Sequence, residues 1–90
     1  MKTPLYTKKF EKDLERCKKR SLNIDDIKKI MKRLIAGEKL EPKHNNHPLH
    51  GDFVNCLECH IYPDWLLIYM IDQKANTITF LRTGTHADLF

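Results

Sequence analysis

The segment Trp65–Ile71, with the sequence WLLIYMI, is apolar at nearly every position. Its length is that of a strand and falls far short of the roughly 20 residues that a membrane-spanning helix needs. A strand that is apolar on both faces is typical of the centre of a sheet, where other layers cover each face. The run therefore predicts a sheet in which it forms a central strand.

One further strand is predicted on each side of this run. Residues Phe53–Ile61 precede it, and Thr77–Arg82 follow it up to Gly84. The segments between the strands, Tyr62–Asp64 and Asp72–Asn76, contain the Pro, Asp and Asn residues that favour turns. The second half of the chain is therefore predicted to supply most of the sheet.

The beginning of the chain has a different period. A short strand is predicted over Lys2–Tyr6, and Pro4 would confine it to an edge or a bulge because proline donates no ladder hydrogen bond. Thr7 is a suitable N-cap for a helix that runs to about Lys19. Apolar side chains at i, i+4 and i+7 form one stripe along this helix: Phe10, Leu14 and Cys17.

A second helix is predicted between an Asn23 cap and a stop at Gly37. One side of it is apolar: Ile24, Ile27, Ile30, Met31, Leu34 and Ile35. The two helices would form a hairpin with an apolar inner surface. Ninety residues are enough for one small domain, so we expect a single domain over residues 1–90, with the order strand, helix, helix, strand, strand, strand.

The basic residues gather in the first half of the chain. There are 16 Lys+Arg against 12 Asp+Glu, a formal net charge of +4, and only Lys74 and Arg82 follow Lys43. Four basic side chains lie roughly opposite the apolar stripe of the first helix: Lys8, Lys12, Arg16 and Lys19. Such a face either keeps a small helix soluble or follows the phosphate backbone of RNA.

Side chains that can transfer protons gather in residues 44–90, which hold all five histidines. Glu58 and His60 are two residues apart and so share one face of their strand, and Asp64 lies in the turn beyond. Such residues could surround a phosphodiester with an acid, a base and a cation. The set comprises His47, His50, Glu58, His60, Asp64, Arg82 and His86. The terminal Phe90 could stack on an RNA base.

A second interpretation rests on the segment CLECH at 56–60, a C-x-x-C-H motif. It could attach a haem, or bind zinc together with His47 or His50. In an extended strand Cys56 and Cys59 point to opposite faces, which argues against both. The N-terminus lacks the apolar stretch of a signal peptide, so we expect a cytoplasmic protein with reduced thiols, and haem attachment belongs to oxidising compartments.

Three segments together resemble one family. They are HPLHG at 47–51, ECHIYPDWLLIY at 58–69 and RTGTHADLF at 82–90. The pattern is similar to that of the YafQ branch of the RelE/ParE toxin superfamily. The match is dense over residues 44–90 and looser over the first half, where the order of elements agrees.

The resemblance implies a fold and an activity. The fold would be α+β, with a two-helix hairpin packed on a small antiparallel sheet. The protein would be an mRNA interferase of a type II toxin–antitoxin pair, a ribosome-dependent endoribonuclease that acts in the A site. A cognate antitoxin would neutralise it, and it would be a monomer when free. No metal or other cofactor would be needed, because the RNA 2′-OH is the nucleophile.

The resemblance also implies roles for individual residues. His86 would be the general acid, Asp64 or His60 the base, and His47 an assisting or positioning residue. Glu58 stands where relatives often have Asp. Arg82 would offset the charge that develops on the phosphate, and Phe90 matches the aromatic residue at the C-terminus.

Two alternatives to a nuclease stay open from the sequence. One is a non-catalytic metal-binding module built on Cys56, Cys59 and histidines, and the other is a degenerate toxin that only binds its antitoxin. The superfamily also contains gyrase-poisoning members without nuclease activity, but these would have no acid–base use for the set of histidines. The basic helices fit either ribosomal RNA or an antitoxin segment.

Overall fold

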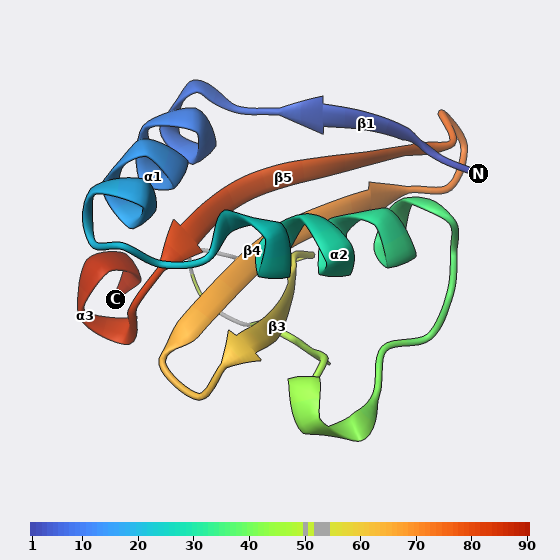
Figure 1. Ribbon diagram of the computed structural model, residues 1–90. Coiled ribbons are helices and arrows are strands. Elements are labelled where there is room, and N and C mark those ends of the chain that lie inside the picture. Colours follow the sequence, from blue (N-terminus) through green and yellow to red (C-terminus); the bar gives the residue numbers. More distant parts are fainter. Residues whose placement is uncertain (50, 52–54) are drawn as a thin grey trace.

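The computed structural model describes residues 1–49, 51 and 55–90. Both helices of the predicted hairpin and all the predicted strands are present, with three short elements added (Figure 1). The elements are β1 (Thr3–Tyr6), α1 (Lys8–Lys19), α2 (Ile24–Ile35), the 3₁₀ helix η1 (Pro42–His44), β2 (His47–Pro48), β3 (Leu57–Tyr62), β4 (Trp65–Asp72), β5 (Thr77–Gly84) and α3 (His86–Leu89). Among the described residues, none of the helices has the length and apolar character that crossing a membrane requires.

The strands form one sheet in the order β1-β5-β4-β3-β2. The central place predicted for Trp65–Ile71 is confirmed, because β4 is the middle strand and residues 65–69 are buried. The edge position predicted from Pro4 is also confirmed, since β1 pairs only with β5. The sheet differs from the prediction in one respect: β1 runs parallel to β5, so the sheet is mixed and not wholly antiparallel.

The direction of β1 follows from the connection that leaves it. The chain passes from β1 through α1 and α2 and enters the sheet again at its far edge, at β2. The three antiparallel strands β3, β4 and β5 then return the chain to the side of β1. Because helices separate β1 from the other strands, no turn forces it to be antiparallel to its neighbour.

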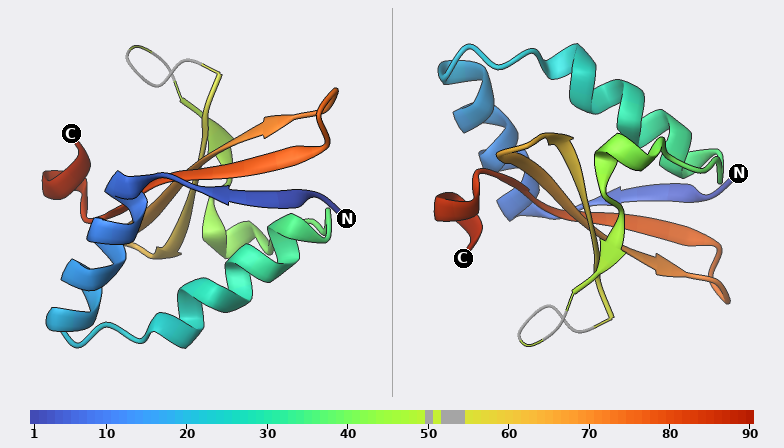
Figure 2. Two further views of the ribbon diagram at one scale, coloured as in Figure 1. Left: turned by 90° about the horizontal axis from the view of Figure 1, so that it is seen from above. Right: turned by 90° about the horizontal axis from the view of Figure 1, so that it is seen from below.

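Both long helices lie on the same side of the sheet (Figure 2). The main core lies between them and the sheet, and includes Phe10, Ile27, Cys59, Leu67 and Phe80. A smaller buried cluster lies on the other face of β4 and contains Cys56, Leu66, Ile68 and Leu89. Leu89 belongs to α3, so the end of the chain covers part of the face that the long helices leave open.

The helix boundaries agree with the predicted caps. Thr7 Oγ1 accepts a hydrogen bond from the Phe10 N–H at 3.0 Å, and Asn23 Oδ1 accepts one from the Asp25 N–H at 3.0 Å. Gly37 follows the end of α2 with φ of +79°, a left-handed conformation that glycine adopts without strain.

Three short elements were not predicted: η1, β2 and α3. The strand predicted from Phe53 begins in the structure at Leu57 as β3, and residues 53–54 lie outside the described residues. The tail after Gly84 forms α3, which starts with a capping box between Thr85 and Asp88. These elements have two to four residues each, too few to show a hydrophobic period.

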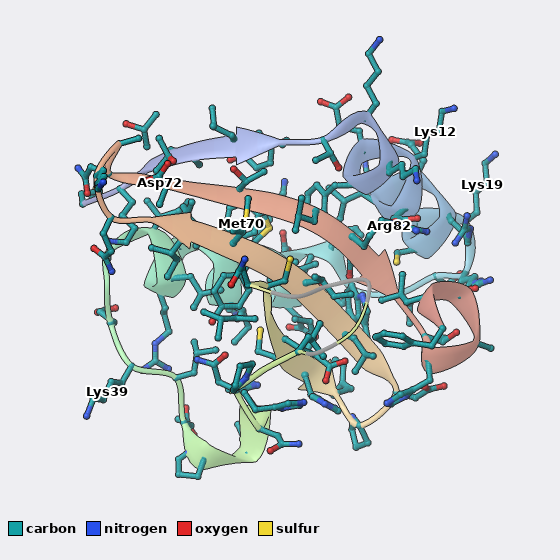
Figure 3. All side chains as sticks on the ribbon, turned by 180° about the vertical axis from the view of Figure 1, so that it is seen from behind. Lys12, Lys19, Lys39, Met70, Asp72 and Arg82 are labelled. Atoms are coloured by element: carbon teal, nitrogen blue, oxygen red, sulfur yellow. The ribbon has the colours of Figure 1, made fainter. Side chains whose placement is uncertain are left out.

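A buried carboxylate joins α1 to the end of β5. Asp13 is 1% exposed and accepts hydrogen bonds from Arg82 Nε at 2.7 Å and Arg82 Nη2 at 3.2 Å. It also accepts the backbone N–H of Thr83 at 3.2 Å. In Figure 3, Arg82 lies against α1, whereas Lys12 and Lys19 extend away from the body of the molecule. Asp13 therefore holds α1 on the strand that leads into α3.

We expect Asp13→Ala to lower the free energy of unfolding by about 2–4 kcal/mol, because it leaves the Arg82 guanidinium and the Thr83 N–H without their acceptor. Urea denaturation followed by circular dichroism measures the change. Glu15→Ala is the matched control on the same helix, since Glu15 is exposed and lies 3.8 Å from the exposed Lys18; it should change stability by less than about 0.5 kcal/mol. Equal losses in both variants would contradict this account.

Candidate active site

The alternation of side chains along β3 separates core residues from site residues. Cys59 and Ile61 pack in the main core beneath the helices. Glu58 and His60 alternate with them and therefore lie on the opposite face of the sheet. The short strand β2 pairs with β3 so that His47 is directly opposite Glu58. The predicted shared face of Glu58 and His60 thus gains a third member from the neighbouring strand.

Glu58 lies between two histidines. Its Oε2 is 2.8 Å from His47 Nε2 and 3.7 Å from His60 Nε2. The Glu58 side chain is 7% exposed, whereas His47 is 40% exposed and His60 15% exposed. A buried carboxylate therefore orients His47, and both imidazoles remain partly accessible from solvent.

Backbone and side-chain contacts hold His47 in place. Its Nδ1 donates to the carbonyl oxygen of Asn45 at 2.7 Å, so both ring nitrogens of His47 face acceptors. Next to it, Asn46 Oδ1 accepts the hydroxyl hydrogen bond of Tyr69 at 2.7 Å. Burial raises the pKa of Tyr69 to about 12, so this hydroxyl stays a donor at neutral pH.

His44 has a structural position. It is buried, and its Nδ1 donates to the carbonyl oxygen of His60 at 2.7 Å. This bond ties η1 to β3 at the residue that carries a site imidazole. His44 was assigned no role from the sequence, and in the structure it supports the backbone of His60.

Asp64 and His86 form the other end of the site. Asp64 lies in the turn between β3 and β4, and His86 is the first residue of α3. Asp64 Oδ1 accepts the backbone N–H of His86 at 3.0 Å and His86 Nδ1 at 2.7 Å. The backbone N–H of His86, followed by its ring, lowers the pKa of the Asp64 carboxyl below its usual range.

The three histidine rings follow one another across the face of the sheet. The ring centroids of His47 and His60 are 6.2 Å apart, and those of His60 and His86 are 5.8 Å apart. We call His47, His60 and His86 the histidine row. With Glu58 between His47 and His60 and with Asp64 beside His86, the structure brings together five of the six residues predicted to be catalytic.

The sixth, Arg82, is already paired. Two of its guanidinium nitrogens contact Asp13, and this contact raises the pKa of Arg82 further. Its predicted role as a phosphate ligand stays a prediction. The carboxylate that would compete with a phosphate was not singled out from the sequence.

The residues predicted to bind RNA differ in their surroundings. Lys8, Lys12 and Lys19 are exposed on α1. Arg16 instead lies 3.5 Å from Asp13 and 3.8 Å from Asp88 through its Nη1. Phe90, at the end of the chain, is 64% exposed.

The two cysteines of the C-x-x-C-H motif do not share a site. Cys59 lies in the main core, and Cys56 lies in the smaller cluster on the other face of β4. The interpretation as a zinc module built on both thiols is therefore wrong. Within residues 1–49, 51 and 55–90, the group whose atoms could hold a metal is instead His47, Glu58 and His60, with ligand atoms within 4.8 Å of one another. His50 lies outside the described residues.

Comparison with known protein families shows which family this chain belongs to. Residues 2–90 match the model of the family described as bacterial toxin of type II toxin-antitoxin system, YafQ. The chain belongs to the YafQ toxin family. The curated protein mRNA interferase toxin YafQ of Escherichia coli strain K12 is 36% identical over 86 residues, which cover 94% of this chain and 91% of that protein.

Solved toxin structures superpose along the whole chain. The YafQ toxin in the E. coli DinJ-YafQ complex has a TM-score of 0.92 and 33% identity, covering 100% of this chain and 99% of that one. A metal-bound toxin from Helicobacter pylori has a TM-score of 0.94 and 38% identity, with 100% of both chains covered. The predicted membership of the YafQ branch and the α+β fold are confirmed, and the predicted enzyme class, an endoribonuclease toxin, is that of the curated relative.

Several residues that support the site were not found from the sequence. Asp13 could have been noticed, because it stands three residues after Phe10 and four before Cys17, within the apolar stripe of α1. Asp88 also had a local signal, since Thr85-x-x-Asp88 has the spacing of a capping box. Asn46 gave no such signal, because its partner Tyr69 is distant in sequence.

We expect the three cysteines to resist alkylation in the folded protein at about pH 8. Burial raises the pKa of Cys17 and Cys56, and burial followed by the charge of Glu58 raises that of Cys59 to about 12, so little reactive thiolate forms. Iodoacetamide labelling followed by mass spectrometry, with and without denaturant, measures this. Rapid labelling of Cys56 and Cys59 in the native protein, suppressed by added zinc, would contradict the burial described here.

Proposed function

We propose that this chain is a ribosome-dependent mRNA endoribonuclease of the cytoplasm, which cuts mRNA in the A site and uses no metal in the reaction. The observation that carries this proposal is the histidine row, in which the rings at its two ends are held by different carboxylates. The base removes the proton from the RNA 2′-OH, the 2′-oxygen attacks phosphorus, and the bond to the 5′-oxygen breaks. The acid protonates that oxygen, which leaves a 2′,3′-cyclic phosphate and a 5′-OH.

His86 is suited to the role of the acid. Its Nδ1 donates to Asp64, so when the ring is an imidazolium its second proton is carried on Nε2. Asp64 fixes the orientation of the ring. A carboxylate held in this way acts on the imidazole and is less available as a base for the 2′-OH.

His60 is the better base of the two remaining histidines. Its Nδ1 lies 3.3 Å from the carbonyl oxygen of Pro63, an acceptor, which leaves Nε2 as the nitrogen with a lone pair in the neutral ring. Glu58 is 3.7 Å from that Nε2, beyond hydrogen-bond distance. His60 can therefore take a proton without first breaking a contact.

His47 is suited to charge stabilisation. Its two nitrogens face Asn45 and Glu58, which holds the ring in one orientation. When this ring carries a proton on each nitrogen, it would offset the negative charge that grows on the phosphate in the transition state. His47 would thus share the charge-offsetting role that was predicted for Arg82. The guanidinium group of Arg82 is already bound to Asp13.

The partners proposed for this chain are mRNA on the ribosome, ribosomal RNA and a cognate antitoxin. The exposed Lys8, Lys12 and Lys19 offer a basic face to RNA phosphates. The antitoxin is proposed because an E. coli relative has been solved in a DinJ-YafQ complex. The free toxin would be a monomer, and Phe90 would contact an RNA base.

We expect His86→Gln to cut mRNA about 10²–10⁴-fold more slowly, because glutamine cannot protonate the leaving 5′-oxygen. The measurement is primer extension of mRNA 5′ ends in a reconstituted translation reaction, with and without ribosomes. Lys74→Gln, in the exposed turn between β4 and β5, is the control and should cut at the wild-type rate.

Three outcomes of that assay separate the alternatives. Ribosome-dependent cuts at A-site codons support the proposal. Cuts that need no ribosome would keep the nuclease and remove the ribosome from the mechanism. A folded wild-type protein that gives no cuts in either arm would favour a degenerate toxin that only binds its antitoxin.

A second candidate function is the binding of a transition metal by His47, Glu58 and His60. Two imidazoles and a carboxylate are a donor set that suits zinc or copper, and a toxin from H. pylori with the same fold has been solved with metal bound. The three ligands would come from β2 and β3 and would include the proposed base. A metal held here would therefore occupy groups that the cleavage reaction needs.

We expect chelator-treated protein to bind one zinc ion, and Glu58→Gln to weaken this binding by more than about tenfold, as measured by isothermal titration calorimetry. Cys56→Ser is the control and should bind zinc as the wild type does. Zinc should also slow mRNA cleavage in the assay above. Faster cleavage with zinc would contradict the metal-free mechanism. Loss of zinc binding in Cys56→Ser would show that the Cys56 thiol is a zinc ligand.

A further inference from the structure

The last helix of the chain is too short to be stable by itself. α3 has four residues, and a single helical turn in water does not repay the entropy of fixing its backbone. Yet α3 begins with His86 and leads to Phe90, so its position decides where both side chains lie. Contacts from elsewhere in the molecule must therefore hold it.

One polar contact on α3 comes from the end of α1. Arg20 is the C-cap residue of α1, and its Nη1 and Nη2 lie 2.6 Å from Asp88 Oδ2 and 3.1 Å from Asp88 Oδ1. This is the two-pronged geometry in which guanidinium and carboxylate groups bind best. The two residues are 68 positions apart in sequence, and α1 and α3 lie next to each other at one end of the sheet (Figures 1 and 2). We call this pair the Arg20–Asp88 clamp.

Asp88 also holds the first turn of α3. Its Oδ2 accepts the backbone N–H of Thr85 at 3.0 Å, while Thr85 Oγ1 accepts the backbone N–H of Asp88 at 3.1 Å. Arg20, followed by the Thr85 N–H, keeps the pKa of Asp88 well below its usual range, so the carboxylate is charged at any pH at which the protein works. One side chain thus links the cap of α3 to α1.

Gly84 provides the space for this carboxylate. A Cβ at position 84 would lie 2.8 Å from Asp88 Oδ2, and the backbone there has φ of +155°. The chain therefore has no side chain at the point where Asp88 turns back toward the end of β5. Arg20, Asp88 and Gly84 together form a built contact and not a chance surface pair.

We propose that the Arg20–Asp88 clamp is a positioning device for cleavage, which holds α3 so that His86 stays on Asp64 at the end of the histidine row. This rests on the proposed function, in which His86 is the acid. Arg20 does not touch the reacting atoms in this scheme. It acts through Asp88 and the backbone of α3, two residues away from the imidazole.

The test compares Arg20→Ala with Arg20→Lys, and uses Lys18→Ala as the control for loss of an exposed positive charge on α1. In multiple-turnover cleavage of ribosome-bound mRNA, Arg20→Ala should lower kcat about 10–100-fold and leave KM within about twofold, because a misplaced acid slows chemistry and not binding. Arg20→Lys keeps the charge but cannot make the two-pronged contact of a guanidinium group, so it should recover only part of the wild-type kcat. Lys18→Ala should match the wild type.

A second measurement does not depend on nuclease activity. Hydrogen exchange of the backbone amides at 88–90, which bond to Thr85 and His86, should be faster in Arg20→Ala, while the amides of β4 keep their protection. Asp88→Asn should have at least as large an effect, since it also weakens the contacts of Asp88 with Thr85 and Arg16. The double variant should be no worse than Asp88→Asn alone, because the contact with Arg20 is already lost in that variant.

Failures of the two proposals can be told apart. A wild-type protein that cuts no RNA would overturn the proposed nuclease, while the exchange data would still report on the clamp. Unchanged exchange at 88–90 with an unchanged kcat in Arg20→Ala would overturn the clamp. A raised KM with normal kcat would show that Arg20 contacts RNA, and would overturn the positioning role as well.

Discussion

The buried carboxylate of Asp13 is the interaction on which the active end of the molecule depends. It is almost completely enclosed, and three donors from β5 converge on it, two from the side chain of Arg82 and one from the backbone of Thr83. Burying a charge is costly unless donors surround it, so α1 is held to the register of β5 at which they do. The strand then ends at Gly84 in the position from which α3 can start.

From this anchor the site is assembled from both sides. β5 and α3 deliver His86, and the turn after β3 brings Asp64 to meet it. On the other side, His47 reaches Glu58 because β2 pairs with β3. The hydrogen bond that the Tyr69 hydroxyl donates to Asn46 holds the chain just before β2. The rigid sheet therefore fixes the middle of the histidine row, while its two ends depend on short elements that need outside support.

This division explains what could be predicted from the sequence. The central strand, the capped helices and the common face of Glu58 and His60 follow from local spacing, and each was predicted correctly. The direction of β1 and the helix at the C-terminus depend on contacts between distant parts of the chain. Arg82 shows the same limit: its chemistry suits a phosphate, but its pairing with a residue 69 positions away is a property of packing.

The proposed acid–base cleavage and the proposed metal binding make opposite demands on His47, Glu58 and His60. As an imidazolium, His47 keeps a proton on the nitrogen that faces Glu58, whereas a metal ligand must be deprotonated there. A metal would also take the lone pair of His60 that the 2′-OH requires. Protons and metal therefore compete for the site, so acid should release the ion, and a toxin that holds it should be blocked rather than assisted. The carboxylate of Glu58 serves either state, as the partner of an imidazolium or as a third ligand.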